Sequence, residues 1–105
     1  MTVAMMLEDD GFGVVEAGSA EEALRLVHDG LDAAVLVTDV DLGSGPNGLQ
    51  LADDLRAIHP GIGIVFITGR PASISNRIGH PYEAMLAKPF QGKDLSRLVR
   101  GVTHP

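Results

Sequence analysis

The chain has 105 residues, of which 45% are hydrophobic and 4% aromatic, and a formal net charge of −6. This size fits one domain with a modest core, and the acidic, aromatic-poor composition argues against a direct grip on nucleic acid. The absence of cysteine excludes disulfide and thiolate chemistry, and with no membrane-length apolar stretch and no basic leader we expect a cytoplasmic protein that binds no membrane.

Three elements are predicted in the first third of the chain. Residues 2–9 carry apolar side chains at helical spacing, so they predict a helix that Gly11 ends. Residues 13–17, with two adjacent valines, are typical of a short strand. A capping box that begins at Ser19 starts a second helix, which ends near Gly30.

Three short apolar runs follow, and each of them ends at a polar residue. Their aliphatic content and their lack of polar and apolar alternation are typical of strands buried on both faces. The runs cover residues 33–38, 64–67 and 84–87, and they end at Asp39, Thr68 and Lys88.

Helical and loop patterns separate and follow these runs. Residues 51–58 predict a helix that stops before a proline, and residues 95–102 predict a terminal helix. Residues 41–48 predict a loop rich in glycine, and residues 69–81 a loop with a short helix around 73–78. Helices that alternate with buried strands predict an α/β fold with a doubly wound parallel sheet.

The polar residues that end the strands point to one candidate site. In an open parallel sheet, ligands collect at the carboxyl ends of the strands. We therefore expect Asp39, Thr68 and Lys88 to meet at one edge. A carboxylate, a hydroxyl and an ammonium group in that place suit phosphoryl transfer to the aspartate.

These motifs together resemble the receiver domain of two-component response regulators, and the resemblance covers nearly the whole chain. They are Leu36-Val37-Thr38-Asp39, Phe66-Ile67-Thr68-Gly69 and Leu86-Ala87-Lys88-Pro89-Phe90. The resemblance implies a flavodoxin-like fold with the strand order 2-1-3-4-5. It also implies a regulatory domain rather than an enzyme.

The resemblance assigns a role to each residue of the site. Asp39 would accept a phosphoryl group from a histidine kinase or a phosphotransfer protein. Lys88 would balance the charge of that group, and Thr68 would be the switch hydroxyl that moves toward it. The family has a cis bond at the position of Lys88-Pro89.

One departure from the family concerns Mg²⁺. The family begins with a strand that ends in an acidic pair, whereas this chain starts inside the helix that should follow. We therefore expect one receiver-like domain over residues 1–105, truncated at its amino terminus. Asp9 and Asp10 lie at the other end of the sheet and do not replace the pair. Asp39 and the backbone carbonyl of Asp41 are left as a weak Mg²⁺ site.

A second departure concerns the switch. The family has tyrosine or phenylalanine three residues before the lysine, and this chain has Met85. A methionine supplies neither a ring nor a hydroxyl whose burial could signal phosphorylation, so any switch must use other surfaces.

Two functions remain open. The chain is either a phosphoacceptor or a degenerate, non-phosphorylated receiver that acts as a protein-interaction module. A third interpretation is an unrelated small α/β enzyme, but the sequence indicates no pocket for it. The four histidines lack the spacing of metal ligands.

The missing strand also bears on assembly. In the family order it is central, so residues 13–17 and the strand before Asp39 lose a shared neighbour. Unpaired strand edges invite pairing with another chain. We expect either direct pairing of these two strands or a homodimer that fills the gap, and of these we favour the dimer.

Overall fold

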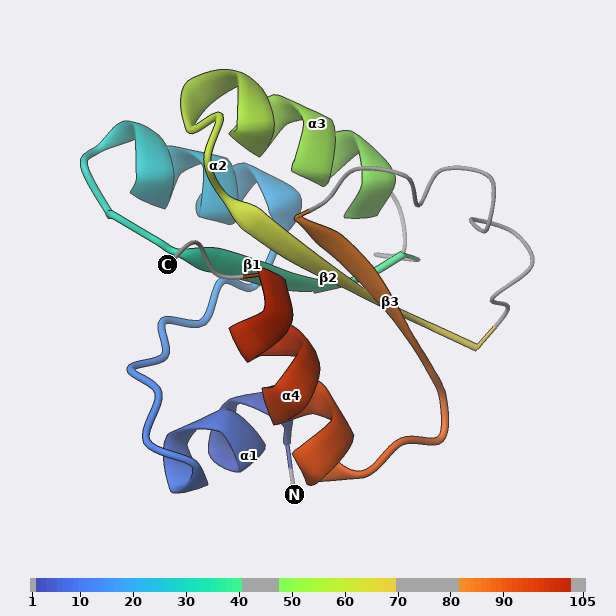
Figure 1. Cartoon of the computed structure of the whole chain (residues 1–105). Helices are drawn as coiled ribbons and strands as arrows, with labels where there is room; N and C mark the ends of the chain where they lie inside the picture. The colour runs from blue at the N-terminus through green and yellow to red at the C-terminus, as the bar shows by residue number, and fades with distance from the viewer. Residues whose placement is uncertain (1, 41–47, 70–81, 103–105) are drawn as a thin grey trace.

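The computed structural model describes residues 2–40, 48–69 and 82–102, and within them the predicted alternation of helices and strands is confirmed (Figure 1). The helices among these residues are α1 (Val3–Asp9), α2 (Ala20–His28), α3 (Gly48–Ile58) and α4 (Gly92–Val102). The strands are β1 (Val35–Asp39), β2 (Gly63–Thr68) and β3 (Glu83–Ala87). None of these helices is long and apolar enough to cross a membrane. The predicted short helix at 73–78 lies outside the described residues.

The three strands form one parallel sheet in the order β1-β2-β3. Val35 pairs with Gly63 at the start of β1, and Asp39 pairs with Ile67 at its end. On the other side of β2, Thr68 pairs with Ala87. All three strands therefore end at the same edge of the sheet.

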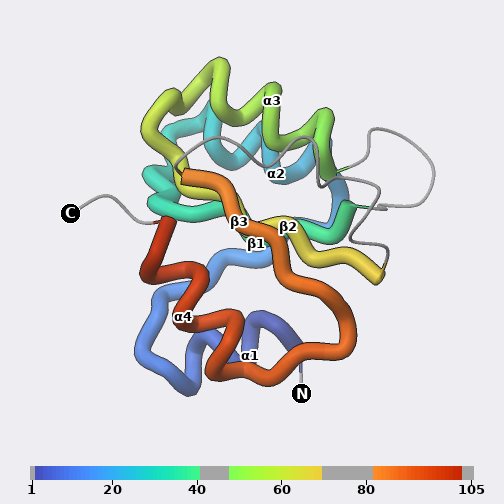
Figure 2. The backbone as a smooth tube through the Cα atoms, turned by 45° about the vertical axis from the view of Figure 1, so that its right-hand side comes forward, coloured from blue at the N-terminus to red at the C-terminus, as the bar shows by residue number. Residues whose placement is uncertain are grey.

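Two layers of helices cover the sheet, as Figures 1 and 2 show. The helices α2 and α3 pack on one face, where Leu55 and Ala52 meet Phe66. The helices α1 and α4 pack on the other, where Leu7 and Leu95 lie in the second apolar cluster. Since helices cover both faces of a parallel sheet, the predicted doubly wound α/β fold is confirmed.

The predicted helix boundaries are confirmed by their capping bonds. Gly11 and Gly30 follow α1 and α2 with φ of 93° and 113°, a backbone region that glycine enters without strain. The Ser19 hydroxyl accepts a hydrogen bond from the N–H of Glu22 at 3.1 Å. The Glu22 carboxylate in turn accepts one from the N–H of Gly18 at 3.2 Å, one residue earlier than the usual capping box.

The predicted strand at residues 13–17 is wrong. This segment connects α1 to α2 without helix or strand, and the sheet of the described residues contains only β1, β2 and β3. The direct pairing with β1 that we considered is therefore absent from this part of the chain. The physical reason is that a strand needs a neighbour for its backbone hydrogen bonds, and apolar content alone does not supply one.

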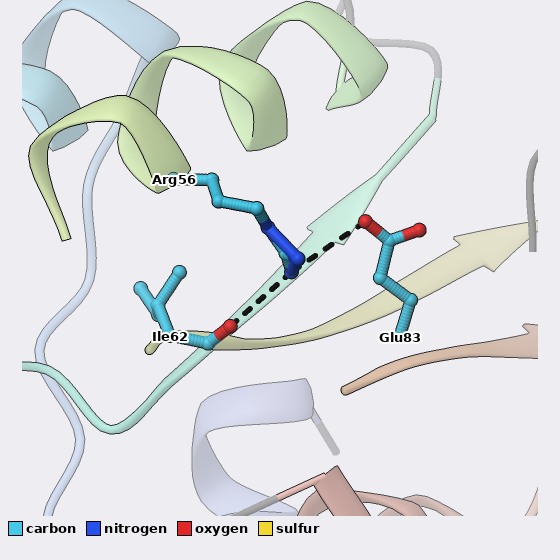
Figure 3. A network of polar contacts seen from close by, with 3 residues as sticks. All are labelled: Arg56, Ile62 and Glu83. Atoms are coloured by element: carbon cyan, nitrogen blue, oxygen red, sulfur yellow. Dashed lines mark hydrogen bonds and ion pairs between the residues drawn. The ribbon is translucent and has the colours of Figure 1, made fainter. Parts of the chain in front are cut away.

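A buried ion pair ties α3 to the amino end of the sheet (Figure 3). Nη2 of Arg56 lies 3.5 Å from Oε2 of Glu83 and donates a hydrogen bond to the carbonyl of Ile62 at 3.2 Å. The two side chains are only 19% and 5% exposed. Nε and Nη1 of Arg56 are buried without a hydrogen-bond partner. The contact thus fixes the position of α3 at a high desolvation cost.

We expect Arg56→Met to lower the free energy of unfolding by about 3 kcal/mol, because the buried Glu83 carboxylate loses its countercharge. The double variant Arg56→Met/Glu83→Leu removes both charges and should recover part of that loss. Urea denaturation of the wild type and the three variants, with Glu83→Leu as the second single variant, measures the coupling. If the losses of unfolding free energy in the two single variants add up to the loss in the double variant, the two side chains do not interact.

Candidate functional site

All three predicted site residues lie at the carboxyl edge of the sheet. The side chains of Asp39 and Lys88 are in contact there, and Thr68 lies on the strand between them. Asp39 is the last residue of β1, Thr68 is the last residue of β2, and Lys88 follows directly after β3. Nζ of Lys88 lies 2.6 Å from Oδ1 of Asp39. The predicted meeting of Asp39 and Lys88 is therefore confirmed.

The ion pair between Asp39 and Lys88 is open to solvent. Their side chains are 45% and 49% exposed, so water screens the attraction and the pair adds little to stability. The ammonium nevertheless balances the carboxylate charge at contact distance. Both side chains are therefore accessible from solvent.

Thr68 is joined to this pair through the backbone. Its side chain is buried, with 4% of the residue exposed, and its carbonyl accepts a hydrogen bond from the N–H of Lys88 at 2.9 Å. The bond between Lys88 and Pro89 is cis, as the family resemblance implied. Through this hydrogen bond, a displacement at the end of β2 would therefore move the backbone of Lys88 as well.

The backbone around Asp39 is fixed by residues that sequence reasoning missed. The hydroxyl of Thr38 donates to the carbonyl of Asp39 at 2.9 Å, and the N–H of Gly48 donates to the carbonyl of Val40 at 2.8 Å. A Cβ atom at Gly48 would lie 2.1 Å from the Asp39 carbonyl oxygen, which no side chain could tolerate. The glycine-rich loop was visible in the sequence, but this close approach was not.

The described residues do not fit a Mg²⁺ ion. The predicted second ligand, the carbonyl of Asp41, lies outside them. Within 2–40, 48–69 and 82–102, no group of three or more histidine, cysteine, aspartate or glutamate side chains could hold a metal ion. Mg²⁺ requires about six oxygens in tight geometry, and one oxygen of Asp39 already contacts Lys88.

The acidic residues after α1 have a different role from metal binding. Figure 1 shows the end of α1 on the left of the molecule, away from the carboxyl edge of the sheet on the right. Oδ2 of Asp10 accepts a hydrogen bond from Nη2 of Arg100 at 2.6 Å, and the same guanidinium lies 5.1 Å above the ring centre of Phe12. Asp10 is therefore part of the contact between α1 and α4.

Hydrogen bonds hold the pKa of the Asp10 carboxyl below its usual value, first from Ser96 and then from Arg100. A carboxyl whose pKa is lowered by folding stabilises the fold above its unfolded pKa, and this contribution is lost as the pH falls through the folded pKa.

We therefore expect Asp10→Asn to be less stable than the wild type at pH 7, and the difference to vanish on acidification below the folded pKa of Asp10. Thermal unfolding across the acidic range measures this. The neighbouring exposed Asp9 provides the control, because Asp9→Asn should leave stability nearly unchanged. A pH-independent deficit in Asp10→Asn would contradict a role for the charge.

Comparisons with known proteins agree with this geometry. The family model described as "Response regulator receiver domain" matches residues 1–100. The transcriptional regulatory protein CpxR of Escherichia coli (strain K12) is 30% identical over 99 residues, which cover 92% of this chain and 41% of that protein. The sensor kinase CckA of Brucella abortus (strain 2308) is 32% identical over 97 residues, 90% of this chain and 10% of that protein. The chain thus spans about two fifths of the curated regulators it matches.

Solved structures of receiver domains are also similar to this chain. The response regulator receiver protein from Sinorhizobium medicae WSM419 superimposes with a TM-score of 0.81 and 31% identity, over 95% of this chain and 84% of that one. The receiver domain of NtrX from Brucella abortus superimposes with a TM-score of 0.77 and 27% identity, over 95% of this chain and 86% of that one.

Proposed function

Because the chain belongs to the response regulator receiver domain family, we propose that Asp39 accepts a phosphoryl group from a histidine kinase or a phosphotransfer protein in the cytoplasm. The observation that carries the proposal is the solvent-open ion pair between Asp39 and Lys88 at the carboxyl edge of the sheet. It supplies a nucleophilic oxygen and a cation beside it, in a place that a protein donor can reach.

The transfer itself needs little covalent chemistry from the protein. An oxygen of the Asp39 carboxylate attacks phosphorus, and an O–P bond forms as the P–N bond of the donor phosphohistidine breaks. The electron pair of that bond returns to the imidazole nitrogen. Catalysis of such a step rests on position and on charge neutralisation, and the ammonium of Lys88 provides the neutralising charge.

Thr68 provides the response to phosphorylation in this proposal. Its hydroxyl would turn toward the new phosphoryl oxygen and shift the end of β2, whose carbonyl holds the N–H of Lys88. The methionine that replaces the family's aromatic residue is partly buried against the cluster under α2 and α3. The signal would therefore spread through the ends of β2 and β3 rather than through rotation of a ring.

A second function is favoured by one specific observation. The described residues hold no group of three or more histidine, cysteine, aspartate or glutamate side chains for a metal ion, and a metal ion is a common source of charge neutralisation in phosphoryl transfer. A receiver that binds partners without being phosphorylated is the corresponding alternative.

Incubation with acetyl phosphate, followed by intact mass spectrometry, separates the two functions. We expect slow and partial addition of one phosphoryl group, which Asp39→Asn abolishes. Lys88→Ala should slow the addition by tenfold or more, on the order of the loss of one charge-stabilising group. If the wild type stays unmodified while circular dichroism shows it folded, the interaction module is the correct function.

We expect Mg²⁺ to bind with a dissociation constant weaker than the low millimolar range, because the described residues place too few oxygens around Asp39. Isothermal titration of the wild type with MgCl₂, with Asp39→Asn as the control, measures it. Tighter binding that disappears in the variant would show that the chain has a metal site after all.

A further inference from the structure

The register of β3 against β2 decides where Lys88 lies relative to Asp39. Lys88 directly follows β3, and Ala87 at the end of that strand pairs with Thr68 at the end of β2. A shift of β3 by two residues would move the backbone of Lys88 by about 6.6 Å along the sheet. That is more than twice the distance of 2.6 Å between Nζ of Lys88 and Oδ1 of Asp39. The contact at the candidate site therefore depends on one register of β3.

Backbone hydrogen bonds and apolar packing select this register only weakly. A shift by two residues keeps each side chain of β3 on its own face of the sheet, and the backbone bonds re-form with new partners. None of the five residues of β3 is fully buried, whereas all six residues of β2 are. Among the described strands, β3 pairs with β2 alone. Its register therefore needs a contact that differs between positions two residues apart.

Arg56 supplies such a contact at the amino ends of both strands (Figure 3). Its Nη2 atom donates a hydrogen bond at 3.2 Å to the carbonyl of Ile62, the residue before β2. The same atom lies 3.5 Å from Oε2 of Glu83, the first residue of β3. One nitrogen atom thus joins the start of one strand to the start of the other. Because the Glu83 side chain is only 5% exposed, loss of this cation would leave a carboxylate where water scarcely reaches it.

Each of the two possible shifts would also move a charge into an apolar place. A shift toward the carboxyl edge brings Glu83 to the place of Met85, which packs against the cluster under α2 and α3, away from Arg56. The reverse shift brings Lys88 to the place of Leu86, which packs against the cluster under α1 and α4. Burial of a charge without a partner is costly. The charges at both ends of β3 therefore oppose a shifted strand.

We propose that Arg56 and Glu83 are positioning residues for Lys88: they fix the register of β3 and thereby hold the ammonium at the Asp39 carboxylate. Glu83 lies five residues before Lys88 along the strand, so the pair acts through β3 and not by contact with the site. The effect on phosphoryl transfer rests on the function proposed above, whereas the effect on register does not.

The double variant Arg56→Met/Glu83→Leu tests the effect on register, because it replaces both charges by apolar side chains of similar size. Scalar couplings across hydrogen bonds, measured by NMR, read the register directly. In the wild type the carbonyl of Thr68 should couple to the N–H of Lys88, its hydrogen-bond donor. In the double variant we expect a second set of signals, in which that carbonyl couples to the N–H of Leu86. Glu83→Gln keeps an oxygen that can accept from Arg56 and should show the wild-type set alone.

Phosphoryl addition from acetyl phosphate tests the consequence at the site, at a temperature where circular dichroism shows every variant folded. We expect the double variant to react about threefold more slowly than the wild type, in proportion to the fraction of molecules in the native register. Glu83→Gln should react at the wild-type rate. So should Asp10→Asn, which weakens the contact between α1 and α4 and leaves β3 unchanged. This control separates a loss of stability from a change of register.

Two results would overturn the proposal. A folded double variant with a single set of signals, in the native register, would show that the ion pair serves stability alone. Two registers with an unchanged rate would show that the position of β3 does not control Lys88. If the double variant does not fold, Glu83→Leu is compared with Glu83→Gln, and a single register in both would overturn the proposal equally.

A failure of the proposed function would be distinguishable from these results. If the wild type accepts no phosphoryl group, the function proposed above is wrong. The NMR couplings of Thr68 and the contact between Lys88 and Asp39 then still decide whether Arg56 and Glu83 position the lysine, because neither measurement needs phosphoryl transfer.

Discussion

The strand β2 has neighbours on all four sides: β1 and β3 along its edges, and a layer of helices on each face. All six of its residues are buried, and Ile64, Val65 and Phe66 are completely so. Each such side chain contributes about 1.5–3 kcal/mol through removal from water. Because β1 and β3 hydrogen-bond to this strand in fixed register, its burial also decides where their ends lie. The candidate site is a consequence of that alignment.

The candidate site combines a fixed backbone with movable side chains. Around Asp39 the main chain is held by Thr38 and by the close approach of Gly48, and neither can shift without disturbing the core. The ion pair with Lys88, in contrast, is half exposed and weakly stabilising. The Lys88 ammonium can therefore exchange the Asp39 carboxylate for another anion at a small cost in free energy. The backbone that positions the Asp39 side chain stays in place.

The sequence predicted the features that follow from local patterns and from the common direction of parallel strands. Buried strands were recognisable from apolar runs, helix ends from Gly11 and Gly30, and the meeting of Asp39 and Lys88 from the rule that parallel strands end together. The failures all involve a partner distant in the chain. Residues 13–17 have the composition of a strand but no strand beside them.

The polar contacts between residues distant in the chain could not be predicted from the sequence either. Asp10 and Arg100 are 90 residues apart, so no local pattern could join them. The ion pair of Arg56 with Glu83 was also not predictable from the sequence. A charged side chain is seen to be buried only when the elements that pack around it are known. Composition and periodicity describe which surfaces are buried, but not which polar groups meet between them.

The way α1 is attached has a consequence for local unfolding. This helix has seven residues, too few to persist alone, and its main neighbour among the described elements is α4. Its detachment would expose Leu7 and break the contacts with α4, including the hydrogen bond between Arg100 and Asp10. The removal of β2 would expose a strand of which every residue is buried. Among the described elements, we therefore expect α1 to open at a lower free energy than β2.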